Sequence, residues 1–358
     1  MRTRTFKGRA HDSCVDVLFV NPPSPDGFIY IRDINRHGRS SWERMIWPQT
    51  SLAYLAAIAE QEGYSVDIVD CIAEEIDWQG YRMILSRLKP AFCVGNIISV
   101  TFSNDVATLQ VAKEQFGTIT IGMGPHLTND PARTLREARG LDFIIRNEAE
   151  ATLAELLRLY RNRKSITIDS LRGVKGISFL PGRIDPDNME DVVNTPQRPF
   201  IEDLDSLPRP RHDLLALDRY WAPFLGNYTF VEASRGCAYR CIFCRQAVMW
   251  QWKIRSRKGA CLAEEALYVH SLGVNHIMFH ADTFTLDMQM VVDLCNALIA
   301  QGSPFRWSCN THVKPLLKNS QLLPLMKKAG CWMIAVGIES ADDQVLKNIK
   351  KQITADEA

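Results

Sequence analysis

The sequence lacks the features that would place the protein in a membrane or on nucleic acid. Its 358 residues carry a formal net charge of +1, which gives no electrostatic reason to expect nucleic acid or an anionic membrane as a partner. Its longest apolar runs, such as Phe92–Val100, are well short of the roughly 20 residues that a membrane helix needs. The basic stretch Met1–Ala10 leads into no apolar segment, so we expect no secretory signal and a cytoplasmic location.

The cysteine pattern lacks the spacing of a disulfide framework. Most cysteines are scattered, largely within apolar runs, and we interpret them as small core residues: Cys14, Cys71, Cys93, Cys295, Cys309 and Cys331. Only Cys237, Cys241 and Cys244 cluster, and in a long cytosolic chain a tight cysteine cluster indicates a metal site. The sequence also has no internal repeat, no low-complexity tract, and no GxGxxG after its first expected strand, which counts against a dinucleotide ligand.

The length and an apolar content of 46% suggest two domains, each with its own core. In the first half, apolar β-rich runs alternate with helical patterns. The expected strands are Val15–Val20, Val66–Val69, Phe92–Val100, Thr118–Ile121 and Phe143–Ile145. The expected helices are Ser51–Glu62, Trp78–Leu88, Asp105–Phe116, Ala132–Ala138 and Ala151–Tyr160. This alternation predicts an α/β fold class with a doubly wound domain at residues 1–165, whose parallel sheet is covered on both faces.

Small and polar residues follow four of these strands, where ligands of such sheets bind. They are Asn21-Pro22-Pro23, Ser99-Val100-Thr101, Gly122-Met123-Gly124-Pro125-His126 and Asn147-Glu148-Ala149-Glu150. Small residues let a flat ligand approach the backbone closely. The pattern predicts a ligand site without identifying the ligand, because this fold hosts many functions.

Residues 166–228 are expected to form a hairpin and a linker. The hairpin is Gly176–Asp185, turning at Pro181-Gly182, and the linker is the proline-rich stretch Asn194–Pro223. Residues 229–358 begin a new series of strands, which are Thr229–Ala233, His276–His280, Phe305–Cys309 and Trp332–Val336. The helices of this series are Ala263–Ser271, Met288–Ala300, Gln321–Lys328 and Asp342–Lys350. Four βα units in succession predict a partial βα barrel with its active site at the carboxyl ends of the strands.

The strongest motif is Cys237-Ala-Tyr-Arg-Cys241-Ile-Phe-Cys244. Spacings of four and three let three thiolates reach different irons of a cubane cluster. Because only three cysteines are present, the fourth iron is expected to stay open to substrate. Structural zinc needs four ligands, and no fourth Cys or His lies nearby in the sequence. A zinc site and a chance cluster of buried thiols are therefore the weaker alternatives.

This loop resembles that of the radical S-adenosylmethionine (SAM) superfamily, whose CxxxCxΦC hallmark has an aromatic residue, here Phe243, before the last cysteine. The resemblance implies a [4Fe–4S] cluster on Cys237, Cys241 and Cys244 that reductively cleaves SAM to a 5′-deoxyadenosyl radical. The segments His280–Thr285 and Val336–Ser340 also resemble motifs of this family. The implied SAM contacts are Phe243, Asp282, Asn310, Glu339 and Ser340. For Asp282 and Glu339 the alternative is a helix-capping or surface carboxylate.

The first half resembles the Rossmann-like cobalamin-binding domain that precedes many radical SAM barrels, through NPP, SVTF, GMGPH and NEAEATLAELL. The implied cobalamin contacts are Asn21, Pro22, Ser99, Thr101, Gly122, Gly124, Pro125, His126 and Glu148. Because no Asp stands two residues before His126, we expect this histidine to line the corrin edge by hydrogen bonding and not to bind cobalt.

Two departures from the family pattern concern the ligand sites. The fifth-strand loop, usually GEGE, here begins with Asn147 and has Ala149 at its third position, and a third-strand Arg common in relatives is His312. The first departure is expected to weaken close contact with the corrin, and the second to alter the substrate pocket. Trp250 and Trp252 either stack on substrate or pack the barrel wall.

The resemblance implies a cobalamin-dependent radical SAM enzyme, either a C-methylase or an anaerobic magnesium-protoporphyrin monomethyl ester cyclase-like enzyme. Its partners would be a small-molecule substrate and an electron donor such as flavodoxin or ferredoxin. Such barrels usually have six strands, so we expect a C-terminal truncation that leaves Trp332–Val336 as an edge strand and slows SAM cleavage. The alternatives are a cofactor-binding fragment with weak catalysis, and a radical SAM enzyme whose N-terminal domain binds another ligand.

Overall fold

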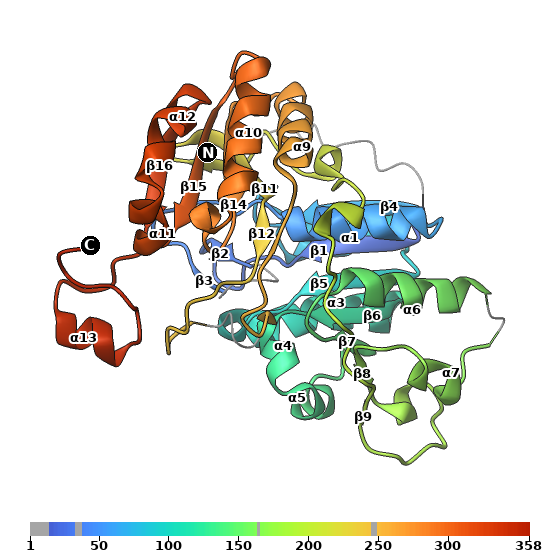
Figure 1. Cartoon of the computed structure of the whole chain (residues 1–358). Coiled ribbons are helices and arrows are strands. Elements are labelled where there is room, and N and C mark those ends of the chain that lie inside the picture. The colour runs from blue at the N-terminus through green and yellow to red at the C-terminus, as the bar shows by residue number, and fades with distance from the viewer. Residues whose placement is uncertain (1–13, 33–37, 163–164, 245–248) are drawn as a thin grey trace.

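The chain is organised around two sheets that lie one after the other in the sequence (Figure 1). The computed structural model describes residues 14–32, 38–162, 165–244 and 249–358, so the basic stretch at residues 1–10 lies outside the described residues. The first sheet has seven strands in the order β4-β1-β5-β6-β7-β8-β9, and the second has five in the order β10-β11-β14-β15-β16. No helix among the described residues is long and apolar enough to cross a membrane.

Five parallel strands form most of the first sheet: β1 (Val17–Asn21), β4 (Val66–Asp70), β5 (Phe92–Asn96), β6 (Ile119–Met123) and β7 (Phe143–Ile145). The antiparallel strands β8 (Ile177–Phe179) and β9 (Val193–Asn194) extend it. Its helices are α1 (Thr50–Gln61), α2 (Trp78–Leu88), α3 (Phe102–Phe116), α4 (Pro125–Asn129), α5 (Pro131–Glu137), α6 (Glu150–Asn162) and α7 (Ile168–Arg172).

Strand β1 shows why both faces of this sheet are covered. Val17 and Phe19 lie in one core together with residues of α1 and α6, whereas Leu18 and Val20 lie in another with residues of α2 and α3. Because successive side chains of a strand point to opposite faces, four consecutive apolar residues need helices on both faces of the sheet. The predicted doubly wound domain is confirmed, and its strand order places the switch point between β1 and β5.

Two expectations for this region are wrong. Phe92–Val100 is not one strand, because β5 ends at Asn96 and a short 3-10 turn at Ser99–Thr101 leads into α3. The sequence resembles one long strand because the two residues after β5, Ile97 and Ile98, are also apolar and buried in the core. The predicted hairpin at Pro181-Gly182 does not form either. Pro181–Arg183 is a 3-10 turn, and β8 pairs instead with β7 and β9, so the sheet continues well beyond residue 165.

The second sheet confirms the four predicted βα units. Its strands are β10 (Trp221–Ala222), β11 (Gly226–Glu232), β14 (His276–His280), β15 (Arg306–Thr311) and β16 (Cys331–Val336), all parallel except β10. Its helices are α9 (Gly259–Ser271), α10 (Met288–Ala300), α11 (Val313–Lys318), α12 (Leu323–Lys328) and α13 (Asp343–Asn348). Figure 1 shows α9, α10 and α12 along one side of these strands, with α13 set apart near the end of the chain. Among the described residues β16 pairs only with β15, as expected for an edge strand.

The two sheets share a core. Tyr228 and Phe230 of β11 belong to the same buried cluster as Val17 and Phe19 of β1, and helix α1 contacts β1, β4 and β11. The proline-rich stretch predicted as a linker packs onto this core through Tyr220, which is buried. The two halves are therefore held in one arrangement and not joined by a loose tether.

Two short ribbons were not predicted. β2 (Tyr30–Ile31) pairs with β3 (Arg39–Ser40) after β1, and β12 (Ser234–Arg235) pairs with β13 (Arg255–Ser256) after β11. Two-residue strands carry too little alternation to be recognised in a sequence. Both ribbons lie next to predicted ligand loops, so they help to shape the sites described below.

Candidate active site

The cysteine loop is the segment between β12 and β13, and the pairing of these two strands joins its two ends, which we call its neck. Gly236, directly before Cys237, has a φ of +91°, and a Cβ there would lie 1.8 Å from the Lys253 carbonyl oxygen. Only glycine can take this position without rebuilding the neck. The Gly236 amide donates to Asp282 Oδ2 at 3.0 Å, which ties the start of the cysteine loop to the loop after β14.

A cavity of about 640 Å³ opens at the carboxyl ends of β14, β15 and β16. This volume is in the range of pockets that enclose small ligands. Cys237, Cys241 and Cys244 all line it, as do four of the five predicted SAM residues, namely Phe243, Asp282, Asn310 and Glu339. The fifth, Ser340, accepts a hydrogen bond from the Asp342 amide at the start of α13.

The three cysteines are the candidate ligands of a cubane cluster. Among the described residues, no group of three His, Cys, Asp or Glu side chains is arranged to hold one metal ion. A cubane asks for a wider arrangement, because each thiolate binds a different iron. The three thiols are partly buried, form no disulfide and face one cavity. These residues therefore fit a [4Fe–4S] cluster at this cavity.

The surroundings of the thiols act on their ionisation in opposite directions. Burial raises the pKa of Cys237 and of Cys241 above the usual value, whereas the Lys351 ammonium acts to lower both. The Thr283 hydroxyl, 3.3 Å from Cys237 Sγ, also favours the thiolate. Iron binds the thiolate form, and Thr283 and Lys351 both favour that form of the thiols they face. Neither residue was predicted, and Lys351 follows the last helix, where no sequence pattern marks a site.

His312, predicted to alter the substrate pocket, joins the cysteine loop to the segment that follows α13. Its ring stacks on Tyr239, with centroids 3.6 Å apart and planes 7° from parallel. Its Nδ1 accepts from the Lys314 amide at 3.2 Å, so its Nε2 carries the proton and donates to the Lys351 carbonyl oxygen at 3.1 Å. Burial lowers the pKa of His312, in keeping with this neutral form. His312 lines the cavity, but both ring nitrogens are engaged with the backbone.

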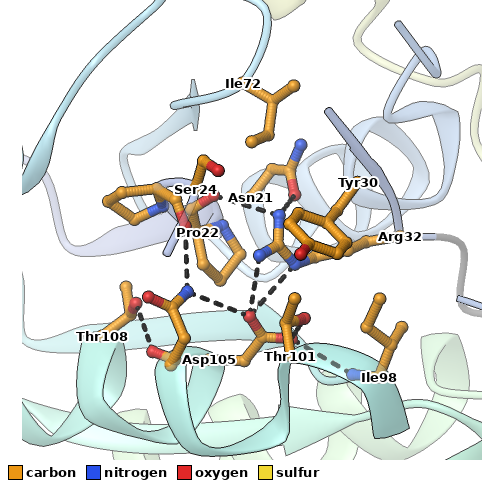
Figure 2. Close-up of polar contacts among 12 residues, drawn as sticks. Asn21, Pro22, Ser24, Tyr30, Arg32, Ile72, Ile98, Thr101, Asp105 and Thr108 are labelled. Carbon is orange, nitrogen blue, oxygen red and sulfur yellow. Dashed lines mark hydrogen bonds and ion pairs between the residues drawn. The ribbon is translucent and has the colours of Figure 1, made fainter. Parts of the chain in front are cut away.

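At the switch point between β1 and β5, the side chain of Arg32 lies among residues that follow these two strands, as Figure 2 shows. The Arg32 guanidinium is fully buried, pairs with Asp105 at 2.9 Å and donates to the Pro22 carbonyl oxygen at 3.1 Å. Asp105 in turn accepts from the Thr101 hydroxyl at 2.7 Å and from the Ile98 amide at 3.2 Å. This network fixes the loops after β1 and β5 relative to each other.

The predicted cobalamin residues therefore differ in how they are presented. Asn21, Pro22, Thr101 and Glu148 are buried, and the polar side chains of Asn21, Thr101 and Glu148 hydrogen-bond within the chain itself. Ser99 is exposed and His126 is partly exposed, and Ser99 Oγ lies 2.9 Å from His126 Nδ1. This polar pair at the ends of β5 and β6 suits the amide-bearing rim of a corrin. Direct side-chain contact is thus easiest for Ser99 and His126.

The glycines of the GMGPH segment serve the packing of the chain itself. A Cβ at Gly122 would lie 2.8 Å from side-chain atoms of Leu127 and Leu141. A Cβ at Gly124, whose φ is +127°, would lie 2.7 Å from the Ile97 carbonyl oxygen. That these small residues also let a flat ligand approach the backbone stays a prediction. Pro125 is buried as the first residue of α4.

A buried ion-pair network connects the two halves beneath the cysteine loop. Arg235 contacts Glu148 at 2.8 Å, Glu150 at 2.6 Å and Glu232 at 2.7 Å, and Arg255 contacts Glu148 at 2.7 Å. All five side chains are 9% exposed or less. We call these five residues the Arg235 network. The Glu148 carboxylate, predicted to contact the corrin, is therefore used to hold the neck of the cysteine loop.

The two tryptophans near the cysteine loop have different surroundings. Trp250 is buried, with the guanidinium groups of Arg235 and Arg255 at 5.6 and 5.3 Å from its ring centroid. It packs the wall, which was one of the two expectations. Trp252 is 41% exposed and lies 5.0 Å from the Arg240 guanidinium.

Comparison with known proteins agrees with this geometry. Residues 231–358 match the radical SAM superfamily, and residues 44–157 match the B12 binding domain. An uncharacterized methyltransferase of Pyrococcus horikoshii is 31% identical over 311 residues, which cover 86% of this chain and 64% of the relative. The anaerobic magnesium-protoporphyrin IX monomethyl ester cyclase of Rubrivivax gelatinosus is 29% identical over 345 residues, covering 95% and 58%. The chain thus spans less than two thirds of the length of either relative.

Solved structures show the same fold. The cobalamin-dependent S-adenosylmethionine radical enzyme OxsB, with aqua-cobalamin and SAM bound, has a TM-score of 0.72 at 17% identity, covering 96% of this chain and 46% of OxsB. The radical SAM methyltransferase TsrM from Kitasatospora setae has a TM-score of 0.70 at 15% identity, covering 95% and 63%. The predicted fold class and the cofactor set of [4Fe–4S] cluster, SAM and cobalamin are confirmed. The chain belongs to the radical SAM superfamily, in the group that also carries a B12-binding domain.

Proposed function

We propose that this chain is the catalytic part of a cobalamin-dependent radical SAM enzyme that methylates an unactivated carbon or oxidatively cyclises a small molecule. The observation that carries the proposal is the single cavity lined by all three cysteines and by residues that follow β14, β15 and β16. When bound, the cluster and SAM supply a carbon-centred radical, and cobalamin supplies a methyl carrier or redox partner. Relatives with both methyltransferase and cyclase names keep both outcomes within the proposal.

The side chains around the cavity divide the work of holding these groups. Cys237, Cys241 and Cys244 would hold the cluster, with Asp282 fixing the start of their loop through the Gly236 amide. Phe243, 50% exposed, offers an aromatic face for a purine. Glu339, which follows β16, offers a carboxylate that can accept hydrogen bonds from ribose hydroxyls.

The remaining contacts are those with cobalamin and with an electron donor. Ser99 and His126 would hydrogen-bond the corrin rim, with no cobalt–histidine bond. Ile242 is 63% exposed within the cysteine loop, so an external donor such as a flavodoxin or ferredoxin can approach the cluster closely. None of the ten cysteines forms a disulfide, which together with an iron–sulfur cluster supports a reducing, cytoplasmic location.

The test is reductive cleavage of SAM by anaerobically reconstituted protein with dithionite. We expect 5′-deoxyadenosine from the native sequence and from Cys261→Ser, because Cys261 lies in α9 and not among the residues that line the cavity. Cys244→Ser should form none. Full activity of Cys244→Ser, or equal loss in both variants, would show that the cavity cysteines are not the cluster ligands.

A further inference from the structure

The end of the described chain is fastened onto the cysteine loop. The Ile349 carbonyl oxygen accepts from the Ile242 amide at 3.1 Å, between two of the cysteines. The Lys351 carbonyl oxygen accepts from His312, which stacks on Tyr239 of the same loop. On either side of Lys351, Leu346 and Ile353 are buried in a small apolar cluster. Lys351 is therefore held from both sides against the cysteine loop.

The Lys351 side chain points into the cavity that the cysteines line. It is 8% exposed, and its Nζ lies 3.1 Å from Glu339 Oε1 and 6.0 Å from the Phe243 ring centroid. Both neighbours are predicted SAM residues. An ion pair with a carboxylate that is 39% exposed contributes little to stability, whereas burying an ammonium group is costly. Stabilisation of the fold therefore does not explain why a lysine is buried at position 351.

The backbone around this ion pair is strained. Glu339, Lys350 and Gln352 have φ values of +70°, +54° and +61°, in the left-handed region that side-chain-bearing residues rarely adopt. A Cβ at Gly337 would lie 2.9 Å from Glu339 Oε1 and 3.1 Å from Lys351 Nζ. Such strain gathers where a chain places a functional group at a cost to itself. Here it places the Glu339–Lys351 pair in the cavity.

We propose that Lys351 is a positioning residue of the SAM site, which orients the Glu339 carboxylate toward SAM and places a positive charge beside the cluster thiolates. The inference rests on the proposed function and adds a residue to it. A nearby cation stabilises the reduced, more negative form of a cluster, so Lys351 raises the cluster's reduction potential. It therefore has two separate effects, one on SAM affinity and one on potential.

The experiment compares Lys351→Met, Lys351→Arg and Glu339→Gln with Lys350→Met as the matched control, since Lys350 is the exposed neighbour. For each reconstituted protein we would measure iron content, the Kd of SAM and the cluster midpoint potential without SAM. Lys351→Met should weaken SAM binding roughly tenfold or more and make the potential more negative, because a charge-assisted bond and a cation are lost. Lys351→Arg should keep both values near those of the native sequence.

Glu339→Gln separates positioning from simple support of the fold. It should weaken SAM binding as Lys351→Met does but shift the potential in the opposite direction, because it removes a negative charge. The inference is overturned if Lys351→Met leaves Kd and potential unchanged, if Lys351→Arg fails as Lys351→Met does, or if the two potentials move together. In each of these three outcomes the proposed function still holds if the native protein carries about four irons and binds SAM. If the native protein carries no cluster, both the inference and the proposed function fail.

Discussion

Replacing Arg235 with Met tests how strongly the Arg235 network joins the two halves of the chain. Arg235 is 2% exposed and pairs with Glu148, Glu150 and Glu232. Methionine fills much of the same volume but carries no charge. Arg255 still pairs with Glu148, whereas Glu150 and Glu232 lose their ion pair with Arg235.

The expected loss in the free energy of unfolding is large and depends on pH. Removing one partner of a buried pair costs about 3–5 kcal/mol, because the other charge stays buried. Burial already raises the pKa of Glu232 to about 7 with Arg235 in place. Without Arg235 this pKa rises further, so the native state of the variant holds extra protons that the unfolded state releases above a pKa of about 4.5. Stability then falls as pH rises, by about 1.4 kcal/mol per pH unit for each extra proton.

The assay is urea unfolding of the apoprotein, followed by tryptophan fluorescence at pH 6 and pH 8. We expect the variant to lose more stability at pH 8 than at pH 6. Arg172→Met is the control, because Arg172 pairs with Glu190 on the surface, where the two side chains are 42% and 52% exposed. Loss of this pair should leave the free energy of unfolding almost unchanged at either pH. A loss below about 1 kcal/mol, or an equal loss at both pH values, would refute the reasoning from burial and charge.

Two further predictions concern histidines. His126→Ala should weaken binding of hydroxocobalamin without changing the electron paramagnetic resonance spectrum of the cob(II)alamin form, whereas nitrogen superhyperfine splitting that disappears in the variant would show that His126 binds cobalt. His276 accepts from Trp332 Nε1 at 3.1 Å, and burial lowers its pKa to about 4. Because the folded pKa lies below the unfolded value of 6.5, the neutral His276 ring stabilises the folded state. This contribution is fully present above pH 6.5 and is lost as pH falls toward 4. The unfolding free energy should drop by about 2 kcal/mol between pH 7.5 and pH 5, and a His276→Gln variant with the same drop would contradict the assignment.

The regular elements and the cluster motif were predictable because their signals are local. Val17 to Val20 of strand β1 are all apolar, which needs helices on both faces, and Cys237, Cys241 and Cys244 lie within one short loop. The hairpin at Pro181-Gly182 was mispredicted because a turn signal says nothing about which distant strand a segment pairs with, and β8 pairs with β7 and β9.

Other site residues were not predictable because their roles come from long-range contacts. Arg32 is fully buried against Asp105, 73 positions away, and nothing near it in the sequence predicts burial. Glu148 was assigned to the corrin from its motif, yet its partners Arg235 and Arg255 come from the other half of the chain. Lys351 resembles any surface lysine after a helix until the fold places it beside Glu339.

The central claim is that Cys237, Cys241 and Cys244 hold a [4Fe–4S] cluster at the cavity where SAM binds. Electron paramagnetic resonance of the dithionite-reduced, reconstituted protein with and without SAM tests it most directly. We predict a reduced-cluster signal whose g values change when SAM is added, and no such signal in Cys241→Ala. A native signal that SAM leaves unchanged, or a full cluster in Cys241→Ala, would contradict the account.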